Sequence, residues 1–90
     1  MAVTCNITYK GIPVNGAKFT VLGAYQKETA ENSFCSYEVE VRTPDDSIIE
    51  LPEWTNVKCG SDLNKTPLNV AEDDMKARLT AAGATNITDV

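Results

Sequence analysis

The sequence contains no histidine, and aromatic residues make up only 7% of its 90 residues. Histidine is the usual general acid or base at neutral pH and the commonest metal ligand, so its absence weighs against hydrolytic and zinc chemistry. No apolar run approaches the roughly 20 residues that span a membrane as a helix. We therefore predict a protein that is not an enzyme, holds no metal or cofactor and does not insert into a membrane.

Basic residues are also few, since eight Lys and Arg stand against thirteen Asp and Glu, for a net charge of −5. A nucleic acid is bound through clustered Lys and Arg, whereas the basic residues here are interleaved with acidic ones. Residues 1–4 have neither the positive start nor the apolar stretch of a secretory signal. We expect no nucleic-acid partner and a protein that is made in the cytoplasm.

The length predicts one domain spanning residues 1–90, because 90 residues leave no room for a second core. An apolar content of 42% is sufficient for that core. A small sheet still has edges that must be capped, covered or paired with another chain. Association with other copies is one way to cover them.

Alternation of apolar and polar residues predicts a largely antiparallel β-sheet. It is clearest in the third segment, where Cys35, Tyr37, Val39 and Val41 share one face. The predicted strands cover residues 3–10, 17–26, 34–42, 47–51 and 54–59.

Turn residues separate these strands. The segment from Gly11 to Gly16 predicts the first turn, and the polar residues 27–33 predict an exposed hairpin loop. Gly23 lies inside the second strand, where it predicts a bulge or a close backbone approach. Pro52 separates the last two strands and prevents continuous central pairing between them.

A helix is predicted over residues 67–82. Thr66 and Pro67 form a start signal, although Asn69 with Glu72 offers a second start one turn later. Gly83 is placed to end the helix. The apolar stripe of this helix consists of Leu68, Ala71, Met75, Leu79 and Ala82.

The fold class is therefore α+β, with one C-terminal helix on a small antiparallel sheet or sandwich. Residues 85–90 form a short tail with apolar Ile87 and Val90. This tail either pairs as a last edge strand or reaches a neighbouring subunit.

Cys5, Cys35 and Cys59 are odd in number and far apart in the sequence, which argues against a disulfide scaffold. The simplest interpretation is that they are buried thiols that act as small apolar residues. A single disulfide in an extracellular particle is the alternative. Cys5 and Cys35 lie on apolar strand faces and should resist thiol reagents, whereas Cys59, beside Gly60 in a loop, should react first.

Trp54 and Pro52 form the most conspicuous apolar corner of the chain. Trp54 could anchor a partner or a sugar. Alternatively it fills the end of a small barrel or sandwich, with its N–H bonded to the backbone. Both interpretations remain open from the sequence.

Both ends of the chain carry a resemblance. The segment from Thr8 to Val21 has a strand, a Gly-Ile-Pro-Val turn and an Ala-x-x-x-Val strand. Near the other end, Ala-Ala-Gly-Ala-Thr at residues 81–85 precedes the acidic and apolar terminus Ile-Thr-Asp-Val at residues 87–90. This pattern resembles a group of small tailed-bacteriophage proteins that are encoded among tail and tail-fibre genes. The resemblance covers both ends of the chain, is loose in the middle, and carries over no catalytic or binding residue.

The resemblance implies a structural protein of the virion. We expect it to act by contact with other virion proteins, in several copies, in the tail, the baseplate or a tail fibre. A capsid decoration protein and a small inhibitor of a host protein are the alternatives. The predicted contact residues are Pro52, Trp54, Ile87 and Val90, together with the loop at residues 27–33.

Overall fold

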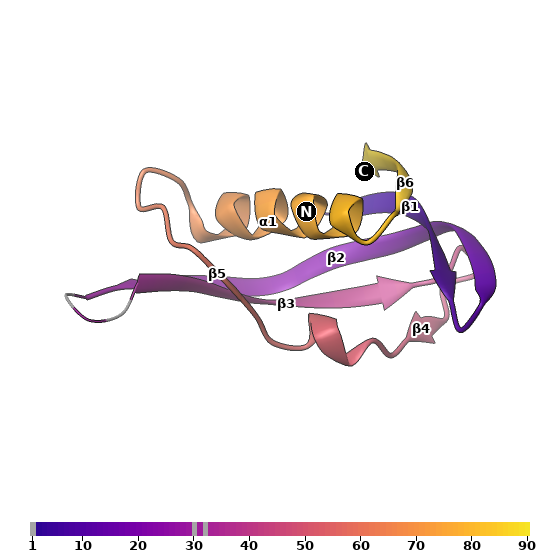
Figure 1. Ribbon diagram of the computed structural model, residues 1–90, viewed down its shortest axis with the longest axis horizontal. Helices are drawn as coiled ribbons and strands as arrows, with labels where there is room; N and C mark the ends of the chain where they lie inside the picture. Colours follow the sequence, from indigo (N-terminus) through magenta and orange to yellow (C-terminus); the bar gives the residue numbers. More distant parts are fainter. Residues whose placement is uncertain (1, 30, 32) are drawn as a thin grey trace.

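The computed structural model describes residues 2–29, 31 and 33–90. Over these residues the chain forms a six-stranded antiparallel sheet with one α-helix near the C-terminus, so the predicted α+β class is confirmed (Figure 1). The elements are β1 (Ala2–Tyr9), β2 (Ile12–Glu28), β3 (Ser33–Arg42), β4 (Ile48–Ile49), the 3₁₀ turn η1 (Pro52–Trp54), β5 (Val57–Cys59), α1 (Pro67–Ala81) and β6 (Thr85–Asp89).

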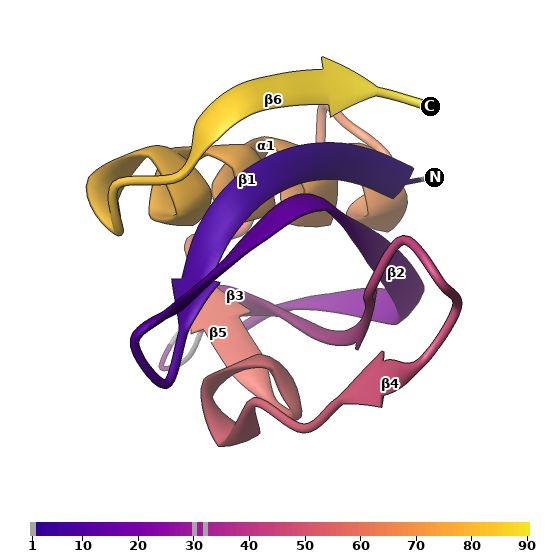
Figure 2. The same cartoon turned by 90° about the vertical axis from the view of Figure 1, so that its right-hand side faces the viewer.

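The strand order is β4-β3-β2-β1-β6, and β5 pairs with a different part of β3. The long strand β2 joins the two halves of the sheet, because it pairs with both β1 and β3. Figure 2 shows the sheet curling from β6 to β4, with α1 covering one face. The molecule is elongated, at 44 × 22 × 22 Å, and the last part of β2 and the first part of β3 project beyond the helix (Figure 1).

The first turn is tighter than the sequence suggested. Lys10 and Gly11 both have positive φ, at 50° and 78°, and they form the whole connection between Tyr9 and Ile12. This is the geometry of a two-residue hairpin turn that matches the twist of its strands. The prediction of a turn from Gly11 to Gly16 was therefore wrong, and β2 begins at Ile12 instead of residue 17.

Two glycines in β2 mark irregularities of the ladder. Gly16 has a φ of 81° beside the register shift between β1 and β2, and its N–H donates to Asn6 Oδ1 at 3.0 Å. The register against β3 shifts between Val21 and Gly23, which confirms the predicted bulge. Leu22 is the extra residue there, and 55% of its surface is exposed.

The segment before the helix departs most from prediction. The strands predicted over residues 47–51 and 54–59 shrink to two residues in β4 and three in β5. Pro52 opens η1 instead, and the N–H of Trp54 donates to the Leu51 carbonyl at 3.0 Å. Pro52 suits the first position of such a turn because its φ is already fixed and its missing N–H is not needed there.

The helix begins where Thr66 predicts it. The Thr66 Oγ1 atom accepts a hydrogen bond from the Asn69 N–H at 3.2 Å, which excludes the alternative start at Asn69. The helix ends at Ala81, and Gly83 follows with a φ of 89°, the left-handed conformation expected of a helix-ending glycine.

The predicted apolar stripe of α1 is right in its middle and wrong at its ends. Ala71, Met75 and Leu79 are buried, but Leu68 is 42% exposed and Ala82 is exposed as well. Both residues point toward the same side as Met75, but they belong to the first turn and to the cap. The core therefore covers only the central turns of the helix.

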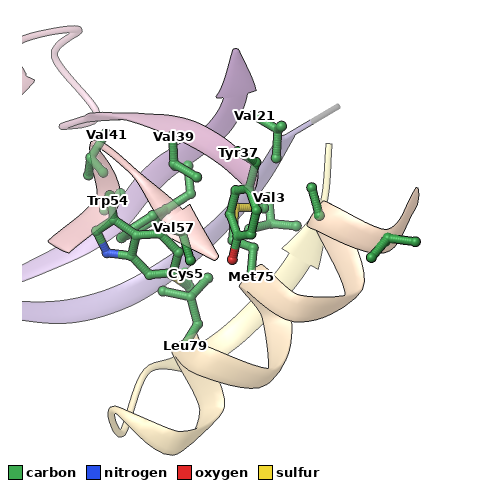
Figure 3. Packing of buried hydrophobic residues seen from close by; sticks show 14 of the residues in the cluster. Val3, Cys5, Val21, Tyr37, Val39, Val41, Trp54, Val57, Met75 and Leu79 are labelled. Atoms are coloured by element: carbon green, nitrogen blue, oxygen red, sulfur yellow. The ribbon is translucent and has the colours of Figure 1, made fainter. Parts of the chain in front are cut away.

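The core lies between α1 and the covered face of the sheet, and Figure 3 shows Met75 and Leu79 reaching it from the helix. Phe19, Met75 and Val3 are among its largest fully buried side chains. The predicted inward face of β3 is confirmed, since all four of its residues are buried. The buried apolar residues are Val3, Cys5, Ala17, Phe19, Val21, Cys35, Tyr37, Val39, Val41, Ile49, Trp54, Val57, Val70, Ala71, Met75 and Leu79.

Candidate partner-binding surfaces

Trp54 fills the core from η1 (Figure 3). Its side chain is 7% exposed, and its ring meets the edge of Phe19 at a centroid distance of 5.5 Å and an interplanar angle of 70°. Trp54 is thus a buried plug, one of the two interpretations left open by the sequence. The expected hydrogen bond from the indole N–H to the backbone is absent among residues 2–29, 31 and 33–90.

A cleft of about 410 Å³ opens beside Trp54, between the β1–β2 hairpin and the C-terminal end of α1. Its lining includes the rings of Phe19 and Trp54 together with the polar side chains of Asn15 and Glu53. We call this the end cleft. The small part of Trp54 that remains accessible belongs to it.

Pro52 lies on a different surface. A second hollow, of about 450 Å³, runs beside the middle of β3 and is bounded by β4 and η1. We call it the edge groove, and its lining consists of Leu22, Glu38, Val39, Glu40, Val41, Ile48, Ile49, Glu50, Leu51, Pro52 and Thr55. Pro52 and Trp54 were predicted to form one contact corner, but they line different surfaces.

The edge groove combines exposed apolar side chains with carboxylates. Leu22 and Ile48 are 55% and 59% exposed. Glu38 and Glu50 are exposed beside them. The neighbouring residue Glu40 is half-buried and already pairs with Arg42 at 2.7 Å.

The edge groove also coincides with a gap in the β-ladder. On the side of β3 away from β2, β4 pairs with Val41 and Arg42, and β5 pairs with Cys35 to Tyr37. In the described part of the chain, residues 38–40 have no strand partner on that side. The groove therefore lies where the sheet is incomplete.

The tail pairs with its own chain, which resolves the alternative left open by the sequence. β6 runs antiparallel to β1, and the Val90 N–H donates to the Ala2 carbonyl at 3.1 Å. Ile87 packs against the core, and Lys76 of α1 pairs with Asp89 at 2.7 Å. Of the two predicted tail contacts, Val90 remains 72% exposed and Ile87 is half-buried.

A polar cluster at the boundary of the core ties α1 to the sheet. The Tyr37 hydroxyl donates to Asp74 Oδ2 at 2.6 Å, and Arg78 Nε donates to the same oxygen at 2.6 Å. Arg78 also donates to the Lys58 carbonyl of β5 at 2.8 Å. Burial and the Asp74 carboxylate raise the pKa of Tyr37 well above its ordinary value, so the phenol stays protonated as a donor.

Two of the three cysteines are buried, as the simplest interpretation of the sequence predicted. Cys5 and Cys35 are buried free thiols, and Cys59 is a half-buried free thiol. Cys59 ends β5, inside the predicted strand 54–59, and lies directly opposite Cys35 in the ladder. Burial raises the pKa of Cys5, while burial and Asp74 raise that of Cys59 to about 11.

Part of the predicted exposed loop at residues 27–33 belongs to strands. β2 extends to Glu28 and β3 begins at Ser33, and Ala30 and Asn32 lie outside the described residues. Behind the loop, Tyr25 meets the edge of Phe34 at 5.8 Å, and Lys58 Nζ lies 5.0 Å from the centre of the Phe34 ring. The part of the hairpin next to this loop thus carries aromatic surface, with Tyr25 56% exposed.

Two further features bear on function. Across the described residues, α1 is too short and too polar to cross a membrane, and the structure holds no other α-helix there. Within those same residues, no group of three or more Cys, Asp and Glu side chains gathers at metal-binding distance.

Sequence reasoning missed Leu22 and Ile48, the exposed apolar residues of the edge groove. A signal for Ile48 was available, because neighbouring strand residues point to opposite faces and only one of Ile48 and Ile49 can be buried. The exposure of Leu22 follows from the bulge at Gly23, whose effect on the neighbouring side chain depends on the register against β3.

In comparisons with known protein families, curated proteins and solved structures, nothing matched this chain.

Proposed function

We propose that this chain is a structural component of a tailed-phage virion that acts by contact with other virion proteins, in the tail or baseplate. The observation that carries the proposal is the edge groove, where Leu22 and Ile48 present apolar surface to water beside an incomplete strand ladder. Exposed apolar side chains that line one hollow are typical of protein interaction sites. The resemblance of both chain ends to proteins of tail genes favours the tail over the capsid.

The charge of the edge groove indicates the chemistry of the partner. Glu38 and Glu50 are exposed at its rim, and no Lys or Arg is among its lining residues. A complementary surface therefore offers apolar side chains flanked by Lys or Arg. Such a partner would cover Leu22 and Ile48 and place its cations against the carboxylates.

The outer edge of β6 offers a second contact. Among the described residues, β6 pairs with β1 alone and stands at the end of the strand order, so its other side is available for an added strand. Val90 lies beside this edge and is exposed. A subunit with a groove at one edge and a free strand at the other can contact two neighbours, as repeated virion subunits do.

The proposal is tested by mass spectrometry of particles purified from a phage that encodes the chain, with infected cells analysed in parallel. We expect peptides of the chain in intact particles, in constant ratio to tail proteins when tails and heads are separated. Enrichment with heads would favour the capsid decoration protein. Presence in cells with absence from particles would contradict the structural role and favour the host-factor inhibitor.

A matched pair of variants tests the surface itself. Leu22→Asp places a charge in the edge groove, whereas Leu63→Asp makes the same change at a residue that is 64% exposed in a loop outside it. Leu22→Asp should fold and yet be lost from particles, and Leu63→Asp should be incorporated normally. Normal incorporation of both variants would exclude the edge groove as the contact surface.

A further inference from the structure

Strands β3 and β5 place two cysteines opposite each other in the sheet. Cys35 and Cys59 are direct partners in the antiparallel register. Directly opposed residues of such a pair have Cα atoms about 4.5–5.5 Å apart, within the range of about 4.4–6.8 Å that a disulfide spans. The backbone therefore already holds the two residues at bonding separation.

We propose that Cys35 and Cys59 form a cross-strand disulfide within one chain when the protein meets a low-molecular-weight disulfide such as glutathione disulfide. This inference does not depend on the proposed function. It chooses between the two interpretations of the cysteines that the sequence left open, and it names the pair.

The reaction is thiol–disulfide exchange in two steps. The Cys59 thiolate attacks one sulfur of the small disulfide, which forms a mixed disulfide and releases one small thiolate. The Cys35 thiolate then attacks the Cys59 sulfur, which forms the Cys35–Cys59 bond and releases the second small thiolate. The protein loses two electrons, the oxidant gains them, and the two protons of the cysteines end on the two released thiols.

The burial of the cysteines sets their roles. Cys59 is half-buried and can meet an external reagent, whereas Cys35 is 0% exposed and can reach only its neighbour. The Cys35 thiol donates weakly to the Pro67 carbonyl at 3.8 Å, which keeps it beside the start of α1. Cys5 is buried on β1 opposite Ala17 of β2, so it is not the direct partner of either.

The surroundings make the bond slow to form at neutral pH. Burial raises the pKa of Cys35, and burial together with Asp74 raises the pKa of Cys59 to about 11. Arg78 opposes this effect at Cys59, and Tyr37 adds no ionised group because its hydroxyl donates to Asp74. Because the thiolate is the attacking species, the rate should rise about tenfold for each pH unit below the pKa.

The bond would secure the least connected part of the sheet. It closes a loop over residues 36–58, which includes β4, η1 and β5 and thus most of the edge groove. β4 and β5 contribute only two and three residues to the ladder. A covalent link at Cys59 should therefore reduce the opening of this segment, with little change elsewhere.

The test is oxidation of the folded full-length protein with glutathione disulfide at pH 8.5, followed by alkylation of the remaining thiols and tryptic peptide mapping. Cleavage after Lys and Arg places the three cysteines in separate peptides, residues 1–10, 28–42 and 59–65. We expect one linked species that joins residues 28–42 to 59–65, with Cys5 alkylated. Its formation should follow the appearance of the mixed disulfide at Cys59.

Two variants complete the test. Cys5→Ser should leave the yield of the linked species unchanged, and Cys59→Ser should abolish it without producing a Cys5–Cys35 link. Oxidised wild-type protein should also resist proteolysis within residues 47–59 at least several-fold better than reduced protein. Persistence of all three free thiols under these conditions, or a link that includes Cys5 in comparable yield, would overturn the proposal.

Discussion

The α1-covered side of the sheet and the segment at residues 48–59 are held in place by different contacts. On the covered side, Met75 and Phe19 are fully buried, and Tyr37 bonds to the helix through Asp74. The segment at residues 48–59 has only short ladders to β3 and one large buried anchor, Trp54. The contacts with α1 therefore provide most of the stability, whereas the segment at residues 48–59 keeps apolar surface available for contact.

The largest expected effect is on the covered side. Met75→Asp places a carboxylate at a position that is 0% exposed and surrounded by the apolar core. A buried unpaired charge costs several kcal/mol, a large part of the stability of a small domain at about 5–15 kcal/mol. The variant should lose its cooperative urea transition, as followed by circular dichroism. Leu68→Asp on the same helix is the control and should unfold as the wild type does.

The next largest effect should come from Trp54, the large buried side chain that anchors the segment at residues 48–59. Trp54→Ala removes the ring that meets Phe19 and should lower the free energy of unfolding by about 3–5 kcal/mol. Hydrogen exchange should rise first in residues 48–59 if this segment depends on Trp54. A uniform rise across α1 and β1 would show that the two regions are not separate in stability.

The sequence predicted the regions with strong local signals and failed where distant pairing decides. The alternation of β3 and the capping residue Thr66 are local, and both predictions were confirmed. The composition of residues 11–16 predicted too long a turn. Lys10 and Gly11, which both have positive φ, complete the turn by themselves, and residues 12–16 belong to β2.

The candidate surfaces were harder to predict for the same reason. The edge groove depends on which residues of β3 the strands β4 and β5 leave unpaired, and no short-range pattern contains that information. Pro52 was predicted and lies in the groove, but Leu22 is exposed because of the bulge at Gly23. The pairing of Cys35 with Cys59 likewise follows from the order of distant strands.

A smaller effect on the free energy of unfolding is expected in the polar cluster of Tyr37, Asp74 and Arg78. Tyr37→Phe removes the hydrogen bond to Asp74 and should cost about 1.5 kcal/mol, because that bond is made to a charged group. Urea unfolding at pH 7, with Tyr25→Phe as the exposed control, measures this difference. A loss as small as that of the control would show that Arg78 alone holds Asp74.

The difference in stability between wild type and Tyr37→Phe should also depend on pH. The pKa of Tyr37 is raised in the folded state, so above the ordinary tyrosine value of about 10 the unfolded chain binds fewer protons than the folded one. The contribution of Tyr37 is then complete below that pH and falls by about 1.4 kcal/mol per unit above it. The difference in stability between wild type and Tyr37→Phe should shrink as the pH rises from 10 to 11, and a constant difference would contradict this.

The smallest effect on stability should be at the edge groove. Ile48→Asp changes a side chain that is 59% exposed and should shift the free energy of unfolding by no more than about 0.5 kcal/mol. Its neighbour Ile49 is 8% exposed, so Ile49→Asp is the matched comparison and should be strongly destabilising. Equal losses of unfolding free energy in the two variants would show that Ile48 supports the fold and is not a free contact residue.

Hydroxyl-radical footprinting of the chain, free and within purified particles, tests most directly whether the edge groove is the contact surface. The free protein should be labelled at Leu22, Ile48 and Leu63, which are all more than half exposed. In the assembled state the account predicts protection of Leu22 and Ile48, with Leu63 still labelled. Undiminished labelling of Leu22 and Ile48 in particles that contain the chain would contradict it.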